Sequence, residues 1–205
     1  MADYAERSDT LAKCGAALWI VAAVGYLILE ACAAAGFVPT YSYTRNYISD
    51  LGVNSPRAYV MHAAFYLQGI LFLLGALLIV GVPDNRRARI FLALVAANAL
   101  GNMVIGTVHA GPAHRVGAAL AIVGGNLAIA TGSAVVVSVG ARDWYRRASI
   151  LVAALGLLCL LMLLVNSTTA TANLLPDGAW ERGSVYSITL WQLTTGAYLL
   201  RSRRR

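Results

Sequence analysis

The chain has 205 residues, of which 59% are hydrophobic and 12% are charged, and its mean hydropathy is +0.67. A water-soluble domain carries about a quarter charged residues, so this chain has too little polar surface for a soluble globule and is expected to lie in lipid. The net charge of +7 would suit nucleic acid, but the positions of the basic residues, described below, argue against a nucleic-acid partner.

Six apolar segments are long enough to cross the hydrocarbon core of a bilayer, which takes about 20 helical residues. The breaks between them contain prolines, glycines, asparagines or charged residues, which favour turns. The sequence therefore predicts an all-α, polytopic integral membrane protein with one helical-bundle domain over residues 1–205. In chain order, the six predicted transmembrane helices are Leu11–Gly36, Ala58–Val80, Ile90–Val108, Val116–Val139, Ala148–Thr169 and Gly183–Leu200.

Basic residues are unevenly shared between the two sides of this predicted bundle. Twelve of the 16 lysines and arginines lie before or at the start of the first segment (Arg7 and Lys13), join the second to the third and the fourth to the fifth, or follow the sixth. The other four are Arg45, Arg57, Arg115 and Arg182. Because short cytoplasmic loops are enriched in Lys and Arg, we expect a multi-pass protein of the cell (inner or plasma) membrane with both termini in the cytoplasm.

The opposite, extracytoplasmic face is predicted to gather the polar residues that could carry chemistry. It contains the long connection 37–57, which is rich in tyrosine and amide side chains, and all three histidines of the chain. Acid–base catalysis needs carboxyl or imidazole groups, and the candidates are Glu30, Asp50, His62, His114 and Glu181. The candidates for substrate binding are Arg45, Asn46, Tyr47, His109, Arg115 and Arg182.

Each acidic candidate also has a structural interpretation. An ionised Glu30 inside the bilayer would cost about 2.5 kcal/mol or more, so it is either a proton donor or acceptor in a cavity, or a residue paired with an arginine such as Arg45. Asp50 is either a general base or a residue that orders the loop. Glu181 is either catalytic or a residue that interacts with the positive end of the last helix.

No metal or other cofactor is expected. The three histidines together with Asp50 and Glu181 could ligate zinc, but His109 and His114 are five residues apart across a Gly-Pro turn, and this spacing is not that of a known metal motif. The three cysteines, Cys14, Cys32 and Cys159, show no paired spacing and are interpreted as packing residues.

Three motifs resemble those of a bacterial and archaeal membrane protein family, number 998 in the domain-of-unknown-function series. The first is Asn46-Tyr47-Ile48-Ser49-Asp50-Leu51-Gly52, which follows the first predicted helix. The second is the segment 106–117, with His114, and the third is Glu181-Arg182 with Tyr186 and Trp191. The resemblance covers nearly the whole chain and implies a six-helix membrane fold. It implies no reaction, substrate or catalytic residue.

Three functions are compatible with this pattern. The leading hypothesis is a membrane-embedded enzyme that acts on a lipidic or isoprenoid substrate by acid–base chemistry at the extracytoplasmic face. The first alternative is a transporter or lipid-binding protein without chemistry, with a path along Gln68, Asn98, Asn102 and Asn126; these amides are otherwise interpreted as helix-packing residues. The second is a structural subunit of a membrane complex. The expected partners are membrane lipids and a lipidic small molecule, and homo-oligomerisation is left open.

Overall fold

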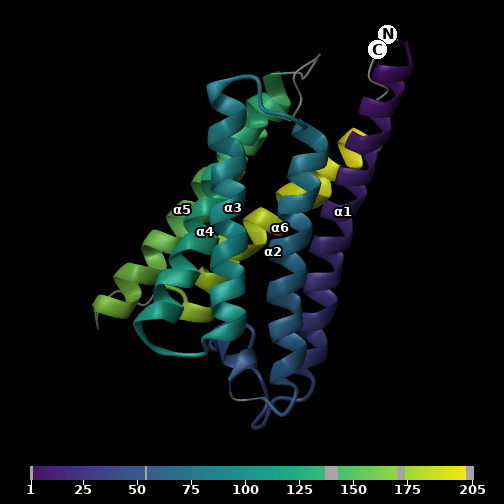
Figure 1. Ribbon diagram of the computed structural model, residues 1–205. Helices are drawn as coiled ribbons and strands as arrows, with labels where there is room; N and C mark the ends of the chain where they lie inside the picture. The colour runs from purple at the N-terminus through teal and green to yellow at the C-terminus, as the bar shows by residue number, and fades with distance from the viewer. Residues whose placement is uncertain (1, 54, 137–142, 170–173, 202–205) are drawn as a thin grey trace.

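The computed structural model describes residues 2–53, 55–136, 143–169 and 174–201. Within these ranges, every regular element is a helix (Figure 1). The helices are α1 (Ala2–Ala34), the short 3-10 helix η1 (Ser49–Gly52), α2 (Ala58–Val80), α3 (Arg86–Thr107), α4 (Gly111–Val135), α5 (Asp143–Thr168) and α6 (Asp177–Arg201).

Within the described residues, six long helices follow one another in the predicted order. The bounds of α2 coincide with the predicted Ala58–Val80, whereas α3 to α6 each begin four to six residues before the predicted apolar segment. These additional residues form a polar first turn that hydropathy alone does not reveal. In α3, for example, the Asn85 side chain caps this turn by accepting a hydrogen bond from the N–H of Ala88 at 2.9 Å.

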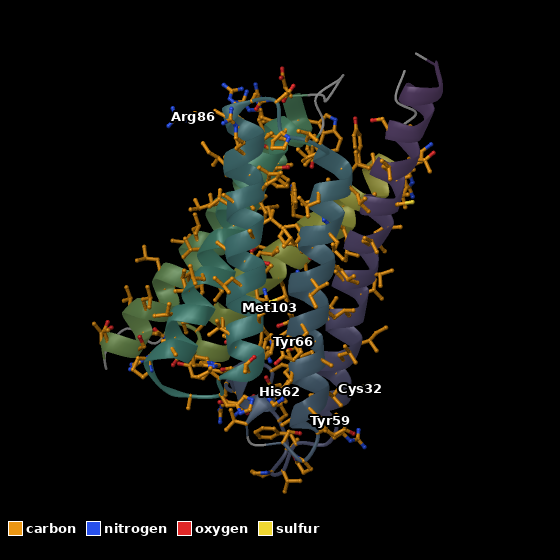
Figure 2. All side chains as sticks on the ribbon, viewed as in Figure 1. Cys32, Tyr59, His62, Tyr66, Arg86 and Met103 are labelled. Carbon is orange, nitrogen blue, oxygen red and sulfur yellow. The ribbon has the colours of Figure 1, made fainter. Side chains whose placement is uncertain are left out.

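The helices pack in chain order, and α6 contacts both α5 and α1. The last residues of α1 and the connections 35–57 and 108–110 lie at one end of the bundle, here called the loop end. The start of α1, the α2–α3 connection and the end of α6 lie at the other end, here called the arginine end (Figure 1). Figure 2 shows Arg86 at the arginine end and His62 and Tyr59 at the loop end.

Helix α6 runs obliquely through the bundle from the loop end to the arginine end (Figure 1). At its start, Gly178 packs against the backbone of Asn46, and near its other end Gly196 packs against Ala16 and Ile20 of α1. Its buried side chains include Ser184, Ser187, Thr189, Gln192 and Thr195. Buried polar residues are therefore concentrated on a helix that packs against α1, α4 and α5.

Five helices are long and apolar enough to span a membrane: residues 8–34 of α1, and α2, α3, α4 and α5. The structure thus supports a membrane protein. Helix α6 is not in this set, because its many hydroxyl and amide side chains lower its hydropathy. Helix α5 is the opposite case, since Leu151, Leu155, Leu158, Leu161 and Leu164 are all exposed on its outer face.

Small residues allow the helices to approach closely. A Cβ atom placed on Gly101 of α3 would collide with the backbone of Gly117 and Ala121 of α4. Likewise, Gly15 of α1 and Gly75 of α2 each lie against the backbone carbonyl of the other. Such small-residue contacts are typical of helix pairs in membranes, where van der Waals packing replaces the hydrophobic effect.

Candidate functional site

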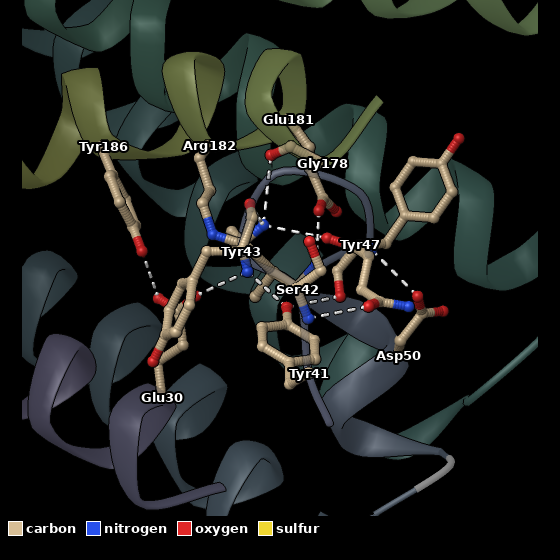
Figure 3. A network of polar contacts seen from close by, with 12 residues as sticks. Glu30, Tyr41, Ser42, Tyr43, Tyr47, Asp50, Gly178, Glu181, Arg182 and Tyr186 are labelled. Carbon is tan, nitrogen blue, oxygen red and sulfur yellow. Dashed lines mark hydrogen bonds and ion pairs between the residues drawn. The ribbon is translucent and has the colours of Figure 1, made fainter. Parts of the chain in front are cut away.

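A buried ion pair joins α1 to α6 at the loop end (Figure 3). The Arg182 guanidinium donates through Nη2 to Oε1 of Glu30 at 3.0 Å, and the Tyr186 hydroxyl donates to Oε2 of Glu30 at 2.8 Å. Glu30 is only 1% exposed and Arg182 only 6%. Both carboxylate oxygens of Glu30 therefore have partners. The structure matches the alternative in which Glu30 pairs with an arginine, but the partner is Arg182 and not Arg45, which is exposed.

Arg182 also holds the long connection in place. Its Nη1 donates to the backbone oxygens of Tyr43, Asn46 (2.9 Å) and Gly178 (3.2 Å), and its Nη2 donates to the Tyr41 hydroxyl. The guanidinium carbon lies 5.3 Å and 5.0 Å from the ring centroids of Tyr41 and Tyr43, within cation–π range. Arg182 thus supplies hydrogen-bond donors to backbone carbonyls in the part of the loop that precedes η1.

Two acids of α6 complete the attachment of this loop. Glu181 accepts a hydrogen bond from the backbone N–H of Ile48 through Oε2. Asp177 accepts one from the Tyr47 hydroxyl at 2.7 Å and another from Nδ2 of Asn166 at 3.0 Å. Burial and the hydrogen bond to Asp177 raise the pKa of Tyr47, and burial raises the pKa of Tyr41. Asp177, and not Glu181, lies at the start of α6, which corrects the predicted capping role of Glu181.

Asp50 and Asn46 order the loop internally. Asp50 accepts a hydrogen bond from the backbone N–H of Tyr47 at 2.9 Å, and Asn46 accepts one from the backbone N–H of Ser42 at 3.0 Å. These are short-range side-chain-to-backbone bonds of the kind that stabilise turns. Asp50 therefore has the geometry of the loop-ordering alternative.

The three histidines do not converge on one point. His62 and His109 stack with their ring centroids 4.2 Å apart, and Nε2 of His62 lies 2.7 Å from the Gly52 carbonyl. His114 instead places Nδ1 2.7 Å from the carbonyl of Val108, where α3 ends. Among the described residues, no group of three or more His, Cys, Asp or Glu side chains is placed to hold a metal ion. The exposed Arg115 follows His114 on the first turn of α4.

A cavity of about 50 Å³ lies beneath η1, among α1, α2, α3, α4 and α6. A space of this size can hold several water molecules or a small group of a ligand. Two of the predicted acid–base residues, Glu181 and His114, line it. Its other polar lining residues are Tyr26, Ser49, Gln68, Asn98, Asn102 and Thr189, and the rest of the lining is apolar.

Two of the amides that line the cavity, Gln68 and Asn98, also connect helices. Nε2 of Gln68 donates to Oε1 of Gln192 at 2.8 Å, which leaves Gln68 Oε1 and Gln192 Nε2 buried and without a hydrogen-bond partner among the described residues. Asn98 donates to the carbonyl of Ala121 at 2.6 Å, and Asn102 donates to the backbone oxygen of Asn98 at 2.9 Å. Gln68 and Asn98 therefore combine both predicted roles, because each lines the cavity and bonds to another helix, whereas Asn102 lines the cavity and bonds within α3. Asn126 differs, because it bonds to α6 and does not line the cavity.

The set of residues brought together at the loop end is therefore partly different from the predicted set. The structure unites Glu30, Asn46, Tyr47, Asp50, Glu181 and Arg182 in one network, and places His62 and His109 nearby. Sequence reasoning did not select Tyr41, Asp177 and Tyr186, which bond directly to this network. The third resemblance motif already contained Tyr186, and this was the signal available for it.

Comparison with known proteins supports the resemblance. Residues 20–198 match the family described as "Protein of unknown function (DUF998)". No curated protein and no solved structure matches the chain. The match covers most of the chain, from α1 through the loop-end network to the last turns of α6. The chain therefore belongs to this family.

Proposed function

We propose that this protein is a membrane-embedded enzyme that acts on a lipidic or isoprenoid substrate by acid–base chemistry, with the cavity beneath η1 as the reaction site. The observation that carries the proposal is the position of Glu181, which lines a cavity whose walls combine apolar side chains with amide, hydroxyl and imidazole groups. Glu30 is fully engaged by Arg182 and Tyr186, so Glu181 is the better placed acid of the two. A partly desolvated carboxyl beside apolar surface is a common form of general acid or base.

His114 is the second proton-transfer residue in this proposal. A carbonyl oxygen only accepts hydrogen bonds, so the contact with Val108 places the proton of a neutral imidazole on Nδ1. Nε2 is then the basic nitrogen. Glu181 and His114 line the same cavity from α6 and α4, and together they could donate and accept a proton on one substrate. Asp50, His62 and Glu30 act as positioning residues that hold the loop over this site.

The alternative of transport is less well supported. A path across the bundle would have to pass a cluster on the arginine-end side of the cavity, in which Trp19, Phe72, Phe91, Ile129 and Trp191 are almost completely buried. The ring centroids of Trp19 and Trp191 are 5.1 Å apart. This packed aromatic cluster favours a cavity with access from one end of the bundle only.

The decisive experiment uses Glu181→Gln, because a glutamine oxygen can still accept the Ile48 N–H while the side chain no longer transfers a proton. The purified protein is incubated with a membrane lipid extract, and products are followed by mass spectrometry. Wild type and the matched control Asp84→Asn, an exposed acid at the arginine end, should convert a component that Glu181→Gln converts about 100-fold more slowly or worse. Equal conversion by Glu181→Gln, or retention of a co-purified lipid without any conversion by wild type, would contradict an enzyme.

We further propose six membrane crossings, with both termini in the cytoplasm. The 25 residues of α6 span roughly 37 Å, more than the hydrocarbon core of about 30 Å. Five of its polar side chains, Ser184, Ser187, Thr189, Gln192 and Thr195, are buried inside the bundle, so low hydropathy is no obstacle to a crossing. The arginine end carries most of the basic residues, which supports its cytoplasmic placement in the cell membrane.

Cysteine labelling tests this topology. In a variant without Cys14, Cys32 and Cys159, single cysteines are placed at the exposed positions Arg45, Arg86 and Arg201. An impermeant maleimide applied to intact cells should label Arg45→Cys alone, and permeabilisation should expose the other two. Labelling of Arg201→Cys from outside would refute the sixth crossing.

A further inference from the structure

A second concave site lies at the arginine end, on the outer surface of the bundle where α4 passes between α3 and α5. It is a groove of about 220 Å³. Its walls come from three helices, so it is a feature of the tertiary structure and not of one helix end. The residues that define it are Arg87 and Ile90 of α3, Ala130 and Ala134 of α4, and Arg146 and Ile150 of α5.

The groove combines positive charge with apolar surface. Arg87 and Arg146 belong to its lining together with Ile90 and Ile150, which are 40% and 43% exposed. Trp144, 57% exposed, lies on the same first turn of α5 as Arg146. Exposed tryptophan is typical of the boundary between lipid headgroups and hydrocarbon. The groove therefore lies at the depth of the membrane where lipid headgroups meet the acyl chains.

The positive charge at this site is not neutralised within the described residues. The structure has two ion pairs among the described residues, Lys13–Asp9 and Arg182–Glu30. Neither includes an arginine that lines the groove. Asp84 and Asp143 are the acids closest in sequence, and neither forms an ion pair with Arg87 or Arg146. Two further arginines, Arg86 and Arg89, line an adjoining hollow that also includes Ile90. An anionic occupant would complement this charge.

We propose that this groove binds an anionic phospholipid of the membrane leaflet at the arginine end. Its phosphate lies between Arg87 and Arg146, and an acyl chain follows Ile90 and Ile150. Basic pockets between transmembrane helices are suited to anionic headgroups, and guanidinium pairs bind phosphate through several hydrogen bonds. The bound lipid would link α3 to α5, which otherwise both pack on α4. The site is at the opposite end from the cavity and does not depend on the proposed function.

The test compares two double variants with the same loss of charge. Arg87→Gln/Arg146→Gln removes the proposed phosphate ligands, and Arg45→Gln/Arg115→Gln removes two exposed arginines of the loop end. Purified proteins in neutral detergent are titrated with phosphatidylglycerol, phosphatidylcholine or inorganic phosphate, and bound lipid is counted by native mass spectrometry. We expect phosphatidylglycerol to bind the groove variant roughly 30-fold more weakly than wild type, and the loop-end variant to resemble wild type.

The outcomes separate a lipid site from general charge attraction. Equal weakening in the two double variants, equal binding of phosphatidylcholine, or binding of free phosphate as tight as that of phosphatidylglycerol would each overturn the proposal. Should the groove variant fail to fold, Arg146→Gln alone is measured, with an expected loss of about fivefold. Unchanged phosphatidylglycerol binding by that folded variant would also overturn it.

Discussion

The loop end and the arginine end use different interactions between the same two helices, α1 and α6. At the loop end they meet through the buried pair of Glu30 and Arg182, with tyrosine hydroxyls and backbone carbonyls around it. Closer to the arginine end they meet through Trp19 and Trp191, whose indole N–H groups donate to the Phe72 carbonyl and the Ser149 hydroxyl. A cavity with titratable groups lies at the first end and a packed aromatic cluster fills the second. Buried ionic and hydrogen-bonded contacts hold the helices together at the loop end, whereas close packing of aromatic side chains holds them together on the other side of the cavity.

The largest effect is expected from Arg182→Ala, which breaks the polar end. It leaves the Glu30 carboxylate buried without its cation and removes the donor for two loop carbonyls, those of Tyr43 and Asn46, and for the carbonyl of Gly178 in α6. Removing one partner of a buried pair costs about 3–5 kcal/mol, and we expect a loss in the free energy of unfolding near 5 kcal/mol, measured by thermal and denaturant unfolding in detergent. The double variant Glu30→Leu/Arg182→Leu should lose less, because no unpaired charge remains. A loss below 1 kcal/mol for Arg182→Ala would show that the pair does not hold this end.

Trp191→Ala tests the aromatic end. The side chain is 2% exposed and lies against Trp19, Phe72 and Phe91, so its truncation leaves a large cavity and should cost about 3–5 kcal/mol. Trp144→Ala is the matched control, because that indole is 57% exposed at the same end, and its loss should be below about 1 kcal/mol. Equal effects of the two substitutions would contradict the packing described for this end.

Gly101→Ala tests the α3–α4 contact that runs between the two ends. At an unobstructed helical position, alanine would stabilise the helix by about 1 kcal/mol relative to glycine. Here the added methyl group would collide with the α4 backbone at Gly117 and Ala121. We therefore expect destabilisation by about 1–3 kcal/mol, seen as a lower Tm. Higher helix propensity would raise the Tm, whereas a collision with the α4 backbone would lower it. A raised Tm would therefore refute the close approach of these helices.

The smallest effect is a loss of stability at alkaline pH, to which two tyrosines of the loop end contribute. The pKa values of Tyr41 and Tyr47 are raised in the folded protein, so the unfolded chain loses these protons first, above about pH 10. Stability is complete below pH 10 and falls above it, by about 1 kcal/mol per tyrosine at pH 11. The Tm of the double variant Tyr41→Phe/Tyr47→Phe should depend less on pH than that of wild type between pH 9 and 11. Identical pH profiles would exclude these tyrosines as the cause.

Much of the architecture follows from the sequence alone. Apolar runs of about 20 residues must cross or lie within lipid, because an unsatisfied backbone in hydrocarbon is forced into helices. Turn-forming residues then fix where the runs end, which is why Ala58–Val80 was predicted to the residue. Glu30 was recognisable as a candidate site residue, because burying a carboxyl group within an apolar membrane helix costs free energy unless it has a partner or a function. The loop 37–57 was recognisable because its polar side chains follow directly after that helix.

Other features were decided only by the tertiary structure. Nothing in the sequence shows that Arg182, 152 positions away along the chain, approaches Glu30 more closely than Arg45 does, because α6 has to cross the bundle to bring them together. The same crossing divides the acids into different surroundings: Glu30 has two side-chain partners on α6, Asp50 bonds within its own loop, and Glu181 lines the cavity. Residue types determine which charges need partners in a membrane, whereas helix packing determines which partner each one receives.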